Sequence, residues 1–304
     1  MSTPLPPRFP DDLTNPYSAP EAEIGPGQYA GYGLSPTPFT VGDVLSRSWQ
    51  IFKPQMWKCI GVVVFLIVLN FAGQMLLNLV PVLVPRDVDP RVGSAVFFIM
   101  WIGVMLLQIW LGIGQALFML RVARGQDASF NDVFQGGRWI LPVIGASLVF
   151  GLAIGGVIAL CMIPALITMA ALGGNQGAAL VVFGVCALIA VVVLIVVTLR
   201  LSQFYYLIID RGAGVMESLR LSVEVTRGNA GNLLVLGFMT WIINIAGALA
   251  CLVGLFFTMP FTVLLFPVAY LALTGQPIAD PLAQWKPVSD PGILGPDGPV
   301  ADTF

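Results

Sequence analysis

The chain has 304 residues, of which 57% are apolar and only 10% are charged, with a formal net charge of −2. About a quarter of the residues in a soluble domain are charged, so this composition excludes a water-soluble globular protein and a disordered chain. Without a basic field it also excludes a nucleic-acid-binding protein. The composition favours an all-α integral membrane protein that crosses the bilayer several times.

Histidine is absent from the sequence, which removes the usual zinc ligand and the usual general base near neutral pH. The four cysteines fall in or beside apolar stretches and form no Cys-x-x-Cys pair, so we interpret them as packing residues rather than a disulfide framework. They are Cys59, Cys161, Cys186 and Cys251. We therefore expect neither a metal nor another cofactor.

Two proline-rich tails flank the apolar part of the chain. Residues 1–39 and 276–304 contain too little apolar surface to fold, so we predict that both are disordered. The membrane domain is then predicted to occupy residues 40–275.

Stretches without charge locate the membrane spans. The residues between Arg138 and Arg200 are all uncharged, and as a helix they would measure about 90 Å, roughly three times the hydrocarbon thickness. The polar, flexible segment 173–177 divides this stretch into two spans. The same reasoning predicts six spans in all, at about 59–80, 95–120, 141–166, 177–199, 231–250 and 255–273.

The last pair of spans is the least defined by the sequence. Its turn, around Cys251 to Gly254, is short and apolar, and Pro260 and Pro267 are expected to bend the final helix. A single long, broken helix, giving five spans, is the alternative.

Six spans place both tails on the same side of the membrane. That side then carries all but two of the 14 Lys and Arg residues, the exceptions being Arg86 and Arg91. This positive-inside asymmetry predicts that both termini are cytoplasmic. The five-span alternative would move only Lys286 to the other side.

A short, similar segment precedes each predicted hairpin: residues 40–45, 129–134 and 214–219. The first two match a capping box, with a hydroxyl at Thr40 or Ser129 and an acid three residues later, whereas the third has the weaker cap Gly214. Each hairpin also ends close to a glycine, namely Gly125, Gly212 and Gly275. We interpret the domain as three tandem units, each an amphipathic stub followed by a two-helix hairpin.

The first stub has a helical apolar face, and we expect it to lie along the membrane surface. The face is made of Val41, Val44, Leu45, Ser48 and Phe52.

Two of the stubs carry a further resemblance. The segments Leu45-Ser46-Arg47-Ser48-Trp49-Gln50-Ile51-Phe52-Lys53 and Ser218-Leu219-Arg220-Leu221-Ser222-Val223-Glu224-Val225-Thr226-Arg227-Gly228-Asn229 are similar to a repeated segment in a loose group of bacterial polytopic membrane proteins of unknown function. That group includes the membrane domain fused to some glycerophosphodiester phosphodiesterases. The resemblance covers about residues 40–275 and implies a bundle of six or more helices. We do not expect the phosphodiesterase activity here, because the sequence shows no soluble domain to hold its acidic and histidine residues.

No Asp, Glu, Lys or Arg falls inside the six predicted apolar cores, which disfavours a proton- or ion-coupled carrier. Motifs of intramembrane proteolysis, such as His-Glu-x-x-His or paired aspartates, are also missing. We therefore expect a non-enzymatic protein.

The polar residues of the predicted spans are mainly amides. Asn70, Gln74 and Asn78 share one face of the first span, Gln108 and Gln115 lie on the second, and Asn244 lies in the fifth. They are candidates for the polar lining of a path for a solute or a lipid headgroup. The alternative is hydrogen bonding between helices, which contributes about 0.6 kcal/mol for each bond.

A Gly-x-x-x-Gly pattern, Gly151 to Gly155, lies in the third span. Such spacing allows close packing of helices, either within one chain or between two chains.

Together these observations predict a non-enzymatic, multi-pass protein of the bacterial inner membrane, with a role in membrane organisation or partner binding. Its expected partners are membrane lipids and either another protein or further copies of itself. The alternative function is a permease or a lipid-transport component that uses the polar helix face.

Overall fold

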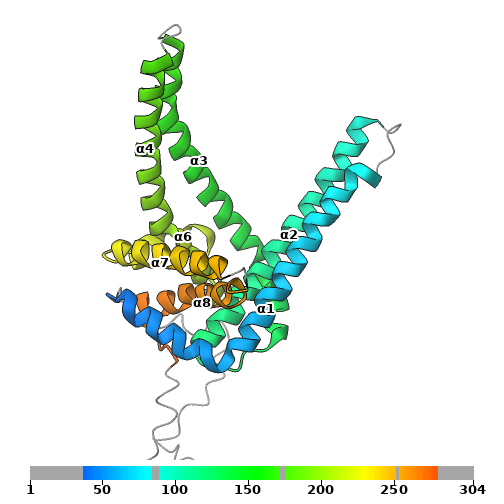
Figure 1. Cartoon of the computed structure of the whole chain (residues 1–304), viewed down its shortest axis with the longest axis vertical. Coiled ribbons are helices and arrows are strands. Elements are labelled where there is room, and N and C mark those ends of the chain that lie inside the picture. The colour runs from blue at the N-terminus through cyan, green and yellow to red at the C-terminus, as the bar shows by residue number, and fades with distance from the viewer. Residues whose placement is uncertain (1–36, 84–88, 172–175, 251–252, 280–304) are drawn as a thin grey trace, which may run out of the picture.

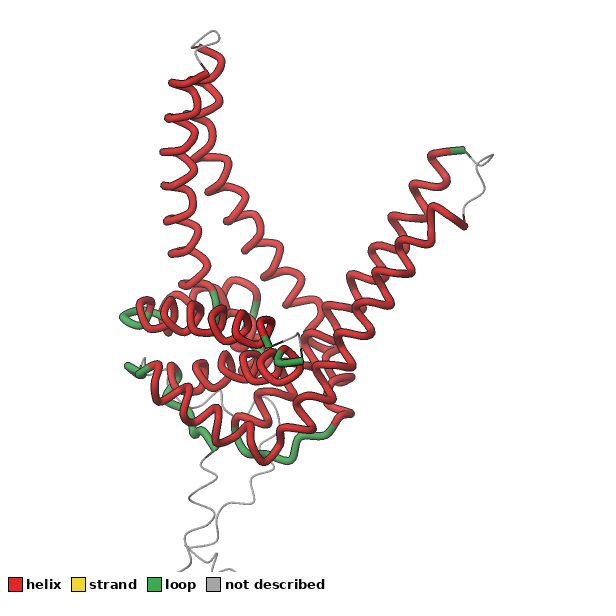
Figure 2. The backbone as a smooth tube through the Cα atoms, in the orientation of Figure 1, coloured by secondary structure: helices red, strands yellow, loops and turns green. Residues whose placement is uncertain are grey.

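The computed structural model describes residues 37–83, 89–171, 176–250 and 253–279, and within these ranges the chain forms helices and loops without strands (Figure 2). The elements are α1 (Val41–Leu83), α2 (Pro90–Ala123), the 3₁₀ helix η2 (Phe130–Trp139), α3 (Ile140–Ala171), α4 (Gln176–Leu201), α5 (Phe204–Arg211), α6 (Val215–Val225), α7 (Ala230–Leu249) and α8 (Leu255–Leu273). The predicted tails lie almost wholly outside the described residues.

Six helical segments are long and apolar enough to cross a membrane, which confirms the predicted all-α membrane fold. They are Val41–Val80, Arg91–Ala123, Phe130–Met169, Leu180–Arg211, Ala230–Leu249 and Leu255–Leu273.

The three helical pairs do not run in one direction (Figure 1). The α1–α2 pair and the α3–α4 pair start close together and diverge, whereas α7 and α8 run across the direction of α3 and α4. The repeated sequence pattern therefore produces three hairpins that differ in orientation.

The last apolar stretch forms two helices that pack against each other, not one long broken helix. A close approach next to the turn makes this possible, because a Cβ atom on Gly254 would lie 2.5 Å from the carbonyl oxygen of Gly247. Cys251, part of the predicted turn, lies outside the described residues.

Each stub packs against the second helix of another unit. The first part of α1 packs on α8, η2 packs on α2, and α6 packs on α5 and on the neighbouring ends of α3 and α4. The second stub thus packs on the first unit, the third stub on the second unit, and the first stub on the third unit. The contacts form a closed ring at the ends of the hairpins.

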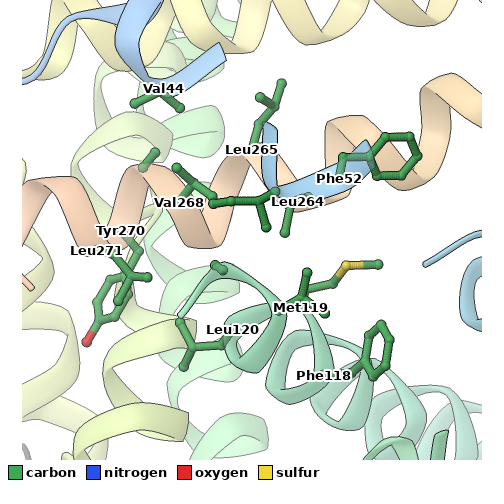
Figure 3. Close-up of a cluster of buried hydrophobic side chains, with 14 of the residues drawn as sticks. Val44, Phe52, Phe118, Met119, Leu120, Leu264, Leu265, Val268, Tyr270 and Leu271 are labelled. Atoms are coloured by element: carbon green, nitrogen blue, oxygen red, sulfur yellow. The ribbon is translucent and has the colours of Figure 1, made fainter. Parts of the chain in front are cut away.

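The first stub corrects one prediction, because its apolar face is buried in protein rather than laid on the membrane surface. Val44 and Phe52 join Leu264, Leu265 and Val268 of α8 in the main hydrophobic core (Figure 3). Other contacts fix the start of this stub to the third unit: Asn232 Nδ2 donates to the Phe39 carbonyl at 2.6 Å, Asn229 Nδ2 donates to the Thr37 carbonyl, and the Thr37 N–H donates to the Leu273 carbonyl.

Helix α1 changes direction between this stub and its membrane-spanning part (Figure 1). Pro54 lies inside the helix, and a proline cannot donate a hydrogen bond to the carbonyl four residues earlier, which bends a helix. The bend allows one helix both to pack on α8 and to pair with α2.

The predicted caps form at all three stubs. The Thr40 hydroxyl accepts from the Asp43 N–H, and the carboxylates of Asp132 and Glu217 accept from the N–H groups of Ser129 and Gly214. Ser222 of α6 also satisfies backbone groups where the chain is interrupted between α4 and α5. Its hydroxyl accepts from the Gln203 N–H and donates to the Arg200 carbonyl.

A buried ionic cluster joins the ends of all three units. Arg124, just after α2, donates to Asp210 of α5 at 2.6 Å and to Gln276 after α8 at 2.5 Å. The other carboxylate oxygen of Asp210 accepts from the Tyr270 hydroxyl at 2.9 Å and from the Gln276 amide at 3.1 Å. Only 8% of the Arg124 side chain and 2% of the Asp210 side chain are exposed, so this pair works in a weakly screened environment.

The glycines that end the units bring these side chains together. Gly125, Gly212 and Gly275 all have φ values near +70°, in the left-handed region that glycine adopts most easily. Each one ends a helix and turns the chain sharply, which directs the neighbouring polar residues into the common cluster.

Helix η2 approaches α2 so closely that only glycine fits at the contact. A Cβ atom on Gly114 would overlap the carbonyl oxygen of Val133, and one on Gly136 would lie 2.5 Å from the carbonyl oxygen of Trp110. The Gly-x-x-x-Gly pattern of α3 behaves differently, since a Cβ atom on Gly151 or Gly155 would meet no atom of another described segment within 4 Å.

We predict that Gly114→Ala destabilises the protein by about 3 kcal/mol or more, because the added methyl group overpacks a contact between two backbones. Thermal unfolding of the purified protein in detergent measures the effect. Gly155→Ala is the matched control and should unfold at the wild-type temperature or slightly above it. Equal unfolding temperatures for the two variants would contradict the contact between η2 and α2.

We also predict that Asp210→Asn costs about 3–5 kcal/mol, because it leaves Arg124 buried without its anionic partner. The control is Asp127→Asn, which breaks the exposed Lys58–Asp127 pair and should cause no measurable loss. The free energies of unfolding in detergent compare the two variants. An Asp210→Asn protein as stable as the control would show that the cluster does not hold the units together.

Candidate functional site

The candidate site lies between the antiparallel helices α1 and α2. Lys58 Nζ and Asp127 Oδ1, 3.5 Å apart, connect the two segments near the ring of stubs. Further along the hairpin Gly73 lets the helices approach closely, because a Cβ atom there would lie 3.1 Å from a methyl carbon of Val104. This register places the second half of α1 beside the middle of α2.

Two adjoining hollows form between the helices. One has a volume of about 120 Å³ and the other, which is more open, has a volume of about 360 Å³. Both are lined by Leu66, Asn70 and Gln115, so the two hollows adjoin at these residues, and we describe them together as one groove. We call it the amide groove, and its four amide residues are Asn70, Gln74, Gln108 and Gln115.

The amide groove brings together side chains from both predicted polar faces. Asn70 and Gln74 come from α1 and are exposed, whereas Gln108 and Gln115 come from α2 and are half-buried. Within the described part of the chain these four side chains make no hydrogen bond, and Gln108 Nε2 is buried without a partner. Each amide therefore retains donors and acceptors for another molecule.

Two other predicted lining residues lie elsewhere. Asn78 donates to the Gln74 carbonyl of its own helix at 3.0 Å and does not line the groove. Asn244 of α7 donates to Thr240 at 3.0 Å and to the hydroxyl of Thr262 of α8 at 3.2 Å. Asn244 thus forms a hydrogen bond between helices, which is the alternative that the sequence left open.

The groove lies between the charged ends of its hairpin. Asn70 is separated from Lys58 by roughly 18 Å of helix, and Gln108 from Arg121 by roughly 20 Å. Arg91 lies near the start of α2, toward the opposite end of the hairpin. With a hydrocarbon layer of about 30 Å, these positions place the amides within the apolar part of a bilayer that the hairpin crosses.

The chemistry of the groove is that of an uncharged hydrogen-bonding site. Its described lining consists of amides and apolar residues, without a carboxylate, a guanidinium or an ammonium group. In the described ranges, no three or more Cys, Asp or Glu side chains gather in a way that suits a metal ion. The groove can bind a neutral polar group, whereas it offers no counter-ion for a phosphate.

Sequence reasoning found the amides but missed other features of the site. The periodicity of α1 indicated Asn70 and Gln74, yet the pairing with Gln108 and Gln115 depends on the register of the hairpin. Gly73 is the residue that could have indicated it, since a glycine inside a membrane helix often marks a close approach of two helices.

Comparisons with protein-family models, curated proteins and solved structures find no match to this chain. The resemblance to the membrane domain of some phosphodiesterases therefore stays an expectation.

Proposed function

We propose that this protein is a non-enzymatic, multi-pass component of the bacterial inner membrane that organises the membrane by binding a partner in the amide groove. The observation that carries the proposal is the set of four amides that make no hydrogen bond within the described part of the chain. Their position at the middle of a two-helix hairpin makes the binding partner a molecule embedded in the bilayer.

The apolar surroundings of the groove raise the free-energy cost of leaving its amides unpaired. An amide without a hydrogen-bond partner is costly in an apolar medium, and lipid tails can neither donate nor accept a hydrogen bond. Hydrogen bonds across membrane helices contribute about 0.6 kcal/mol each. Four amides in one groove thus favour a partner that brings neutral donors and acceptors to the same depth.

The rest of the fold suits a binding platform. The stubs and the ionic cluster fix the hairpins at one end, while the α1–α2 pair extends away from the α3–α4 pair (Figure 1). Because the hairpins are joined at one end and separated at the other, the sides of each hairpin are accessible to molecules within the membrane.

The second candidate function is a permease or a lipid-transport component. The observation in its favour is that the amide-lined hollows adjoin each other, with Asn70 and Gln115 common to both. The groove is formed by only two helices, however, so such a path would follow the side of the hairpin rather than the centre of a bundle.

The orientation of the protein is part of the proposal. Arg121, Arg124, Arg138, Arg200 and Arg211 all lie at or near the ends of helices that take part in the ring of stubs. The positive-inside rule then places this ring and both termini in the cytoplasm.

We predict that a reporter fused before Met1 and a reporter fused after Phe304 both show cytoplasmic activity in a bacterial host. Paired alkaline phosphatase and fluorescent protein fusions measure the side directly. A fusion after Asp89, between α1 and α2, is the matched control and should report the opposite side. Termini on opposite sides would contradict an even number of spans.

We predict that replacing Asn70, Gln74, Gln108 and Gln115 together by Leu removes the bound partner without unfolding the protein, because the change deletes only hydrogen bonds that face another molecule. Native mass spectrometry of the protein, extracted with its lipids, measures what stays bound, and thermal unfolding measures the fold. Asn78→Leu is the control on the same helix and should keep the partner.

Two results would decide against this function. If the four-leucine variant keeps the same bound molecule as the wild type, the groove is not the binding site. If the wild type carries only a stoichiometric lipid, and the variant loses that lipid together with lipid transfer between vesicles, the transport function replaces the proposed one.

A further inference from the structure

We propose that the partner in the amide groove is a second copy of this chain, held in a symmetric dimer about an axis along the membrane normal. This inference rests on the proposed function, because it names the molecule that fills the groove. It goes beyond that function by fixing which residues meet.

A lipid molecule does not match the chemistry of the amide groove, whereas a transmembrane helix does. Lipid tails cannot satisfy the four amides, and the phosphate of a lipid headgroup would enter the apolar layer without a cation, since the described lining of the groove carries no charge. A transmembrane helix with neutral polar side chains meets both conditions. The surrounding apolar side chains, Ile67 and Phe71, are 46% and 68% exposed and would pack against such a helix.

Self-complementarity of the groove favours a second copy of this chain. An amide side chain donates through its nitrogen and accepts through its oxygen, so two identical amides can satisfy each other reciprocally. In a two-fold symmetric interface each residue meets the same surface on its partner. A groove that contains only amides and apolar residues is therefore complementary to itself, whereas a groove with a charge of one sign would repel its own copy.

The depth of each residue in the bilayer determines which residues of the two copies can meet. Two copies inserted with the same orientation place equal residues at equal depths in the bilayer. Asn70 and Gln115 are common to both hollows, and Asn70, the more exposed of the two, would meet Asn70 of the second copy. A buried asparagine pair of this kind sets both register and oligomeric state in coiled coils. Gln74 and Gln115, which also line the open hollow, would then bond across the same interface.

The decisive experiment is photo-cross-linking in living cells. A photoreactive phenylalanine analogue at Ile67 is placed in the full chain, which is co-expressed with a wild-type chain that carries a different tag. We expect a product at twice the 32.5 kDa mass of the chain that contains both tags. The same analogue at Leu188 of α4, a side chain 67% exposed but outside the groove, is the control and should give no such product.

A quantitative arm tests the asparagine pair. Energy transfer between labelled copies in liposomes gives the dimer dissociation constant. Asn70→Leu combined with Gln115→Leu should raise it about 50-fold, which corresponds to four membrane hydrogen bonds of average strength lost from the two copies. Asn70→Gln keeps a donor and an acceptor and should retain most of the dimer. Thermal unfolding of each variant separates loss of the dimer from loss of the fold.

The outcomes separate the inference from the function on which it rests. A cross-link at Ile67 to a protein of another mass overturns the dimer and keeps partner binding. A cross-link to lipid alone, or no cross-link, overturns both. A dimer whose dissociation constant is unchanged by the Asn70→Leu and Gln115→Leu changes shows that the copies meet elsewhere and overturns the amide interface.

Discussion

The buried pair of Arg124 and Asp210 is the interaction on which the rest of the structure depends. It joins the end of the first unit to the end of the second, and Gln276 and Tyr270 bring in the third. A buried ion pair is not by itself a strong source of stability, because desolvation offsets much of the attraction. The pair does, however, require one particular geometry, because a buried charge without its partner greatly lowers the free energy of unfolding. The cluster therefore specifies how the three units meet more than it adds to their stability.

This geometric requirement at the ends of the units explains why the hairpins can diverge. Hairpins inside a bilayer gain little from apolar contact with each other, because lipid tails are equally apolar. The ring of stubs and the ionic cluster supply the missing constraint at one end, so α1 and α2 can extend into the membrane with their amide groove uncovered. The groove thus lies on a hairpin whose base is fixed, which suits the partner binding proposed above.

The sequence predicted the elements better than their arrangement. Long uncharged stretches indicated the six helices, and hydroxyl–acid pairs such as Ser129 and Asp132 indicated the caps, because both signals are local. Arg124 and Asp210 looked like ordinary charges beside a membrane span, and only the three-dimensional arrangement pairs them. The first stub was misplaced for a related reason, since an apolar face suits a membrane surface and a protein surface equally well. Ser48, fully buried in that face, is the signal that could have favoured packing against a helix. The amides were found individually, and their gathering into one groove depends on the register of α1 and α2.

The closed order of the stubs has a consequence for biosynthesis. A ribosome makes the first stub long before it makes α8, the helix that covers Val44 and Phe52. During that interval the apolar face of the first stub is not covered by another part of the protein. Only the final hairpin, once made, completes the ring of stub contacts. The last contact of the ring to form is therefore the one that involves the first stub. A chain that ends before α8 would keep an exposed apolar helix near its N-terminus, which chaperones and proteases can recognise.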